Sequence, residues 1–133
     1  MYLFDTDIVS NLLKKRPSSE LIKKLASISP DQQFISAITV GELVYGAYRS
    51  TRPDYFLGKL DQQVWPNVQI LSFDEKAAHT YGLLRDQLER GGIPLAEPDL
   101  RIASIAISKQ LTLVTGNVRH FSRIARLRIE NWL

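Results

Sequence analysis

The chain lacks the features that mark exported or membrane-bound proteins. Its 133 residues contain no cysteine, which excludes disulfide bonds and thiolate metal sites. No apolar stretch approaches the ~20 residues of a membrane-spanning helix. The first residues have neither the basic start nor the long apolar run of a signal peptide. We therefore expect a cytoplasmic protein without membrane segments, in which any metal is bound by oxygen or imidazole.

The chain also lacks a large excess of either charge, because it has 17 Lys and Arg and 14 Asp and Glu. A net charge of +3 is weak evidence for a polyanionic ligand. The basic residues are clustered, however, and they would form a phosphate-attracting rim if several faced one acidic centre. Solvated helix faces are the alternative interpretation. The clusters are Lys14-Lys15-Arg16, Lys23-Lys24, Arg49 with Arg52, and Arg119, Arg123, Arg126 and Arg128.

The apolar pattern predicts strands alternating with helices. Short apolar runs predict strands over 2–4, 33–38, 68–71 and 111–114, with a short fifth over 127–129. Helical spacing predicts helices over 8–13, 18–28 and 53–64, and others starting at Thr39 and Pro98. A Ser72-x-x-Glu75 capping box predicts a long helix that ends at Gly91. We expect one α/β domain over residues 1–133, a three-layer α/β/α arrangement around a mainly parallel sheet of four to five strands.

Three acids occupy similar places in this pattern. Asp5 follows the first strand, and Glu42 and Asp99 lie in the first turns of predicted helices, each of which we expect a strand to feed. Asn117 comes soon after the fourth strand. Because the carboxyl ends of parallel strands meet in one crevice, these side chains should converge. For Asp5 and its neighbour Asp7 a helix-capping role is an equal alternative.

Clustered carboxylates repel one another unless a cation or a shared proton neutralises them. Oxygen donors suit Mg²⁺ or Mn²⁺, which can activate water for attack on a phosphodiester. Asp5 and Asp99 are the predicted metal ligands, and Glu42 would complete the shell or orient the water. Asn117 would steer a water or a phosphate oxygen. Secondary candidates are Asp7, Thr6, Thr115 and His120, for which caps, turns or a plain surface histidine are the alternatives.

Four segments in this order resemble the PIN-domain toxins of the VapC type. They are Leu3-Phe4-Asp5-Thr6-Asp7, the stretch from Ser36 to Ala47, Pro98-Asp99-Leu100-Arg101-Ile102-Ala103, and the stretch from Leu113 to Phe121. The resemblance extends over nearly the whole chain. It implies a PIN-like α/β/α nuclease domain that uses Mg²⁺ or Mn²⁺ to cut RNA. The family's acids fall on Asp5, Glu42 and Asp99, of which the first and third are its usual metal ligands.

The same resemblance implies the partners of the protein. It implies a homodimer, neutralised by a small VapB-type antitoxin whose C-terminal segment blocks the active site. Operator DNA would be bound only indirectly, through that antitoxin. The chain departs from the family pattern at Asp7, where Asn is common, and at Asn117 and His120, where many relatives carry a fourth acid. We therefore do not assume two metal ions.

Two other functions are compatible with parts of the sequence. Asp5-Thr6-Asp7 also matches the Asp-x-Asp start of haloacid dehalogenase phosphatases, in which the first acid is the nucleophile. Such an enzyme needs an acidic pair after the fourth strand, and none follows here. A non-catalytic module that binds RNA or a protein partner is the second alternative, although three intact acids argue against it.

Overall fold

The computed structural model describes residues 1–133, and its centre is a parallel sheet of five strands. The strands are β1 (Tyr2–Phe4), β2 (Gln33–Ser36), β3 (Gln69–Leu71), β4 (Thr112–Val114) and β5 (Ile129–Glu130). Their order across the sheet is β3-β2-β1-β4-β5, and every neighbouring pair is parallel. The predicted α/β/α architecture with a central parallel sheet is thus confirmed, including the short fifth strand at the edge.

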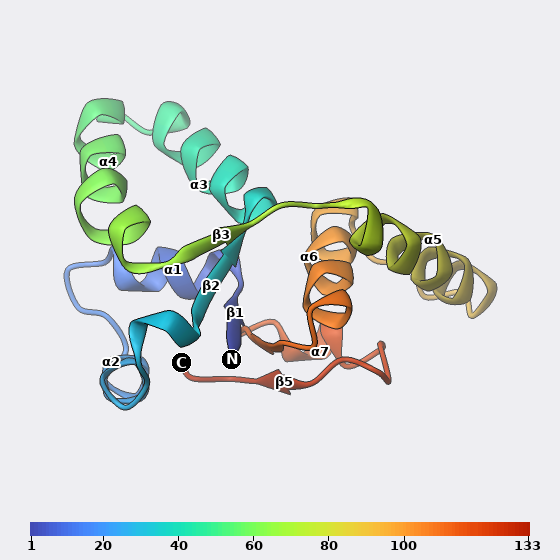
Figure 1. Cartoon of the computed structure of the whole chain (residues 1–133). Coiled ribbons are helices and arrows are strands. Elements are labelled where there is room, and N and C mark those ends of the chain that lie inside the picture. The colour runs from blue at the N-terminus through green and yellow to red at the C-terminus, as the bar shows by residue number, and fades with distance from the viewer.

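Seven α-helices connect the strands (Figure 1). They are α1 (Thr6–Leu12), α2 (Ser19–Ala26), α3 (Ala37–Arg49), α4 (Pro53–Lys59), α5 (Glu75–Arg90), α6 (Glu97–Ser108) and α7 (Val118–Phe121). Helix α4 continues through a π-helical turn over Leu60–Val64 and a 3-10 turn over Trp65–Asn67, and another 3-10 turn spans Pro30–Gln32. In Figure 1, α3 and α4 stand side by side at the upper left, whereas α5 projects to the right. None of the helices combines the length and the apolar character that crossing a bilayer requires.

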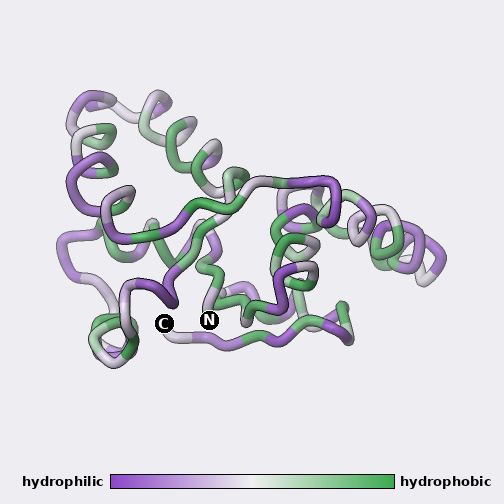
Figure 2. The backbone as a smooth tube through the Cα atoms, viewed as in Figure 1, coloured by the Kyte–Doolittle hydropathy of each residue, from purple (hydrophilic) through white to green (hydrophobic).

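Alternating strand residues divide the interior into two cores. Successive side chains of a strand point to opposite faces of the sheet. Leu3 and Leu113 pack with α5, α6 and α7, whereas their neighbours Phe4 and Val114 pack with α1, α3 and the end of α4. The green segments of Figure 2 accordingly gather on the strands and on the inner sides of the helices. Each face of the sheet therefore has its own helix layer and its own core.

Helix starts are set by caps that differ in part from the predicted ones. Asp5 caps α1, which begins two residues before the predicted Ile8. Ser36 accepts a hydrogen bond from Thr39 N at 3.0 Å, so β2 ends and α3 begins earlier than predicted. The predicted capping box of Ser72 is wrong, because Asp74 caps α5 by accepting from Ala77 N at 2.9 Å.

These boundaries change the place of two predicted site residues. Because α3 begins at Ala37, Glu42 lies in its second turn rather than its first. Asp99 does lie in the first turn of α6, with Pro98 before it, but α6 follows α5 and no strand leads into it. The expectation that a strand feeds each of these helices is therefore wrong for Asp99. Its position depends on how α6 packs against α5 and β4.

The C-terminal segment closes one of the two cores with Trp132. Its side chain is 2% exposed and lies edge-on to Tyr2 and Phe4, with ring centroids 4.9 and 5.5 Å away. The indole N–H donates to Glu130 Oε1 at 2.9 Å, which satisfies the only polar atom of the ring. This packing joins the last residues of the chain to β1, the strand that leads to Asp5.

Trp132→Ala should lower the free energy of unfolding by about 3 to 5 kcal/mol, because it leaves a large cavity under β1. Denaturant titration followed by circular dichroism measures the change. Ile22→Ala is the control, since Ile22 is 48% exposed on α2 and its truncation should change stability by less than about 1 kcal/mol. Equal effects of the two substitutions would contradict the described core.

Candidate active site

The predicted acids face one cavity beyond the carboxyl ends of β1 and β4. Its volume is about 690 Å³. Asp5, Asp7, Glu42 and Asp99 all line it, and so does Asn117. The remaining lining residues are Thr6, Ser10, Asn11, Lys14, Gly116 and Leu133. The fold thus brings Asp5 and Glu42 together at strand ends, as predicted, and it adds Asp99 through the packing of α6.

Asp5 is the most enclosed of these acids and is 6% exposed. Its Oδ1 accepts from the backbone N–H of Thr6, and its Oδ2 accepts from the Thr115 hydroxyl, both at 2.8 Å. Burial raises the pKa of Asp5 to about 6, and the charges of Asp7 and Asp99 act in the same direction. The two hydrogen bonds oppose this rise. Asp5 therefore caps α1 and also lines the acidic cavity.

Asp7 is held against the loop that follows β4. Its Oδ2 accepts from Gly116 N at 2.9 Å, while its Oδ1 is buried without a hydrogen-bond partner. Burial raises the pKa of Asp7 despite that bond. A Cβ atom at Gly116 would lie 2.9 Å from Asp7 Oδ2 and 2.7 Å from Leu133 Cδ1. A side chain at Gly116 would therefore require Asp7 and Leu133 to move.

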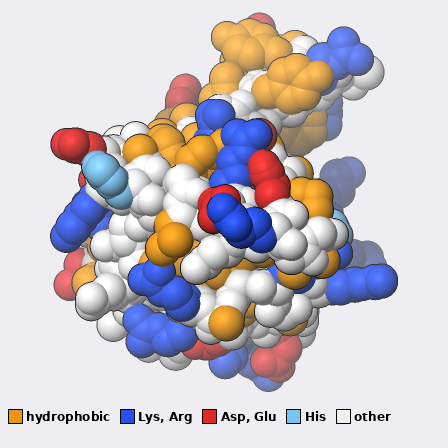
Figure 3. All heavy atoms as spheres, turned by 90° about the vertical axis from the view of Figure 1, so that its right-hand side faces the viewer, with side chains coloured by type: hydrophobic (Ala, Val, Ile, Leu, Met, Phe, Trp, Pro, Cys, Tyr) orange, Lys and Arg blue, Asp and Glu red, His pale blue; other side chains and the backbone are white.

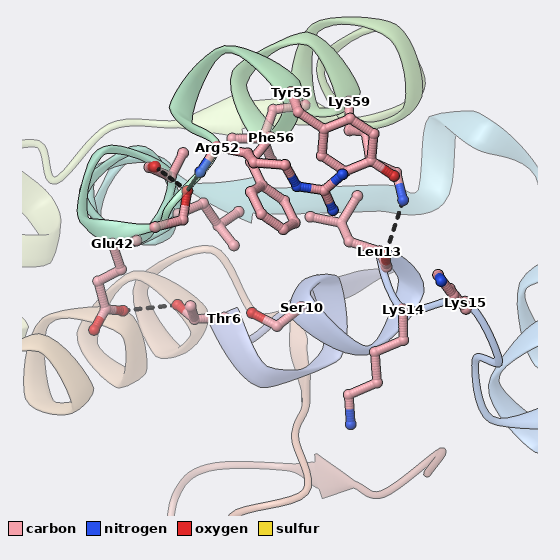
Figure 4. A pocket seen from close by; sticks show the side chains of 15 residues that line it. Thr6, Ser10, Leu13, Lys14, Lys15, Glu42, Arg52, Tyr55, Phe56 and Lys59 are labelled. Carbon is pink, nitrogen blue, oxygen red and sulfur yellow. Dashed lines mark hydrogen bonds between the residues drawn. The ribbon is translucent and has the colours of Figure 1, made fainter.

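Glu42 is fixed by a chain of hydroxyl groups that runs back to β2, and Figure 4 shows the bond at its end, from Thr6 to Glu42. Thr6 donates to Glu42 Oε1 at 2.7 Å, and its oxygen lies 3.1 Å from the Thr39 hydroxyl. Thr39 in turn lies 3.3 Å from the hydroxyl of Ser36, and both are fully buried. Because Thr6 engages only Oε1, the second oxygen of Glu42 stays free for a ligand in the cavity.

Asp99 reaches the cavity from the opposite helix layer. Burial raises its pKa, and the charge of Glu42 raises it further, whereas His120 opposes the rise. His120 is exposed, and its Nδ1 lies 2.9 Å from Asn117 Nδ2. Asn117 thus links the cavity to His120, which does not line it. Thr115 acts from behind the cavity, where it donates to Asp5 and accepts from Asn117 N at 2.9 Å.

The donor set suits a hard divalent cation. The cavity offers carboxylate, amide and hydroxyl oxygens, which are the ligands that Mg²⁺ and Mn²⁺ prefer. Burial raises the pKa values of Asp5, Asp7 and Asp99, and a bound cation would stabilise their charged forms. No three acidic or histidine side chains converge closely enough to enclose an ion by themselves. Water or substrate oxygens would complete the shell, as is usual for Mg²⁺.

Several residues of the site were not singled out from the sequence. Ser36 and Thr39 position Glu42 through Thr6, and Ser36 could have been found as the cap of α3. The role of Gly116 follows from its close approach to Asp7, and no local sequence pattern reveals that approach. Lys14 lines the cavity and belongs to the predicted basic clusters.

Two tyrosines on α3 are not in the core. Tyr45 and Tyr48 are 67% and 65% exposed, so neither packs in the core of this chain. Neither lines the acidic cavity. They form an apolar surface on the outer face of α3 that this chain leaves uncovered.

Comparison with known sequences gives matches over nearly the whole chain. Residues 2–127 match the model of the PIN domain. Ribonuclease VapC2 of Rickettsia felis is 37% identical over 137 residues, which cover 99% of this chain and 98% of that protein. The tRNA(fMet)-specific endonuclease VapC of Salmonella typhimurium is 34% identical over 131 residues, covering 98% and 97% of the two chains.

Solved structures give the same result. VapBC2 from Rickettsia felis, bound to a DNA fragment from its promoter, has a TM-score of 0.92 at 34% identity and covers 99% of this chain and 98% of that one. DNA-bound VapBC from Salmonella typhimurium also has a TM-score of 0.92, at 32% identity, with 99% and 98% covered. Both are VapBC proteins bound to DNA, and the fold is shared over the entire domain.

The buried charge of Asp5 leads to a prediction about stability. A folded pKa of about 6, above the ordinary 3.8, means that the folded state holds the proton more tightly than the unfolded state. The free energy of unfolding should therefore fall as the pH rises from about 4 to about 6, and stay lower above that. Asp5→Asn removes this charge and should raise the free energy of unfolding by about 1 to 3 kcal/mol at pH 7.5 in chelator.

Denaturant titrations of both proteins between pH 4 and pH 8 measure this difference. Asp86→Asn is the control, because Asp86 is exposed on α5 and pairs only with Arg90. Added Mg²⁺ or Mn²⁺ should stabilise the parent protein more than Asp5→Asn. A difference between parent and Asp5→Asn that does not change with pH would contradict the described burial.

Proposed function

Because the chain belongs to the PIN-domain family, we propose that it is a metal-dependent endoribonuclease that acts as the toxin of a VapBC-type toxin–antitoxin pair. The observation that carries this proposal is the convergence of Asp5, Asp7, Glu42 and Asp99 on one cavity at the strand ends. Relatives at 34 to 37% identity are named ribonuclease or endonuclease, which supports RNA as the substrate. The phosphatase alternative is disfavoured, since Thr115, Gly116 and Asn117 follow β4 where an acidic pair is needed.

Asp5 and Asp99 are the proposed ligands of a Mg²⁺ or Mn²⁺ ion, and Asp7, which lines the same cavity, is a secondary candidate. The bound ion would polarise the phosphodiester and lower the pKa of an attacking water. The support is the donor chemistry together with the raised pKa values of these acids, which a nearby cation would lower.

The other residues of the cavity would position the reactants. Thr115 holds Oδ2 of Asp5, and Gly116 N holds Oδ2 of Asp7, so neither carboxylate needs to reorient when substrate arrives. Thr6 fixes Glu42 through Oε1, and the free Oε2 can accept a proton from the attacking water. Lys14 at the rim carries a positive charge that attracts the phosphate.

A VapB-type antitoxin is the proposed protein partner. The two solved structures with a TM-score of 0.92 are VapBC complexes bound to DNA, which supports both the pairing and an indirect contact with operator DNA. A homodimer is proposed as well. Its support in this chain is the exposed Tyr45 and Tyr48 on α3, which offer apolar surface for a second protein.

The purified protein, freed of any partner, should cleave RNA in the presence of Mg²⁺ or Mn²⁺ and stop when a chelator is added. Asp99→Asn should abolish cleavage, at least 100-fold below the parent, because the substitution keeps the shape and removes the charge that would hold the ion. Gel analysis of labelled RNA measures cleavage, and circular dichroism checks the fold. Asp86→Asn on the exposed face of α5 is the matched control and should cleave like the parent. Full activity of Asp99→Asn would remove Asp99 from the metal site.

Expression of the chain without its antitoxin should arrest growth of the host, because RNA cleavage then goes unchecked. Asp5→Ala should relieve the arrest, and co-expression of a VapB-type antitoxin should relieve it for the parent. Growth curves after induction, with immunoblots to equalise protein levels, make the comparison. Equal toxicity of the parent and Asp5→Ala would count against a nuclease mechanism.

A further inference from the structure

A second cavity opens directly beside the acidic one. It has a volume of about 480 Å³ and lies between α1 on one side and α3 and α4 on the other (Figure 4). Thr6, Ser10, Lys14 and Glu42 line both cavities. The second cavity, called here the α1–α4 groove, is therefore continuous with the proposed catalytic site. Anything that extends out of the catalytic site in this direction would enter the groove.

The groove is rich in positive charge that the protein leaves uncompensated. Lys14, Lys15, Arg52 and Lys59 line it, and Glu42 at its inner end is the only acid there. None of these four takes part in an ion pair. On the face at the α5 end, by contrast, basic and acidic side chains are mixed (Figure 3), and Arg85 and Arg90 pair with acids. Within the groove, cations therefore outnumber acids by four to one.

Arg52 has the environment of a ligand-binding arginine. Its guanidinium carbon lies 4.2 Å from the ring centre of Tyr55 and 5.8 Å from that of Phe56, and its side chain makes no hydrogen bond within the protein. Lys59 lies 5.4 Å from the same tyrosine ring and donates to Leu13 O at 3.0 Å, which ties α4 to the end of α1. Arg52 is thus held in place by stacking while its N–H groups stay free for an anion.

We propose that the α1–α4 groove binds the RNA strand adjacent to the scissile phosphate, with Arg52 as the residue that contacts it. This proposal rests on the proposed ribonuclease function. Stacked on Tyr55, the guanidinium can offer its edge to a phosphate and its outer face to a base, and RNA is commonly recognised by stacking on arginine planes. Lys14 and Lys15 would contact further phosphates. Tyr55 is a positioning residue, since it acts through Arg52.

The size of the groove agrees with this occupant. From Glu42 to Ser50, which also lines it, α3 advances by about 12 Å at a rise of about 1.5 Å per residue. Successive stacked bases are about 3.4 Å apart along a strand. The groove is therefore long enough for more than one nucleotide beyond the catalytic site. The four cations of the groove also match the charge of a polyanion.

Binding of single-stranded RNA tests the proposal without the complication of cleavage. Asp99→Asn serves as the non-cleaving parent, and fluorescence anisotropy with a labelled RNA gives the Kd at several salt concentrations. Adding Arg52→Ala should weaken binding roughly tenfold at low salt and reduce the slope of log Kd against log salt by about 0.7, the contribution of one phosphate contact. Arg126→Ala is the matched control. Arg126 lines a separate cavity with Gln110 and Leu111, at the opposite end of β4, and its removal should change neither quantity.

Variants of Tyr55 separate positioning from folding. Tyr55→Leu should weaken binding several-fold, and Tyr55→Phe should restore it, because only the ring is needed to hold Arg52. Thermal melts of each variant show whether the fold is kept. RNA binding by Arg52→Ala equal to that of its parent would overturn the proposal. So would unchanged RNA binding together with loss of the antitoxin complex, which would assign the groove to a protein partner.

The same variants made with Asp99 intact distinguish this proposal from the proposed function. If the wild-type protein cleaves RNA and Arg52→Ala cleaves it equally well at low substrate concentration, only the groove proposal fails. If the wild-type protein cleaves no RNA in Mg²⁺ or Mn²⁺, the ribonuclease function itself fails.

Discussion

The enclosed carboxylate of Asp5 is the constraint on which the rest of the site depends. It ends β1, caps α1 and accepts a hydrogen bond from Thr115 at the end of β4. One side chain therefore joins two neighbouring strands and a helix, at the cost of a charge held away from water. Its pKa of about 6 reflects that cost. A protein selected for stability alone would place a neutral residue here, so the acid is best understood as a functional group.

The surrounding hydrogen bonds keep the other acids from relaxing away from Asp5. Gly116 N engages Asp7, and the hydroxyl chain of Ser36, Thr39 and Thr6 ends on Glu42. These contacts come from main-chain groups and short side chains, which have few alternative conformations. The repulsion among the acids is thus maintained by the fold, and it can be relieved only by protons or by a cation.

Much of this arrangement could be predicted from the sequence, because apolar runs reveal strands and Asp5 directly follows one. The parallel order of the strands then brings the ends of β1 and β2 to one edge of the sheet, and with them Asp5 and the helix that carries Glu42. Asp99 was harder to place, since its helix follows another helix and its position depends on the packing of α6 against α5 and β4. The α1–α4 groove could not be predicted at all. It depends on how far α4 stands from α1, which no local spacing encodes.

The two separate cores have a consequence for how the protein tolerates change. Glu42 is carried by the layer of α1 and α3, whereas Asp99 is carried by the layer of α5 and α6. The distance between Glu42 and Asp99 therefore changes whenever one layer slides or tilts relative to the other. A substitution that loosens either core would disturb the site before the chain unfolds. Selection for activity thus constrains interior residues far from the acids, because the geometry of the site depends on the alignment of the two helix layers.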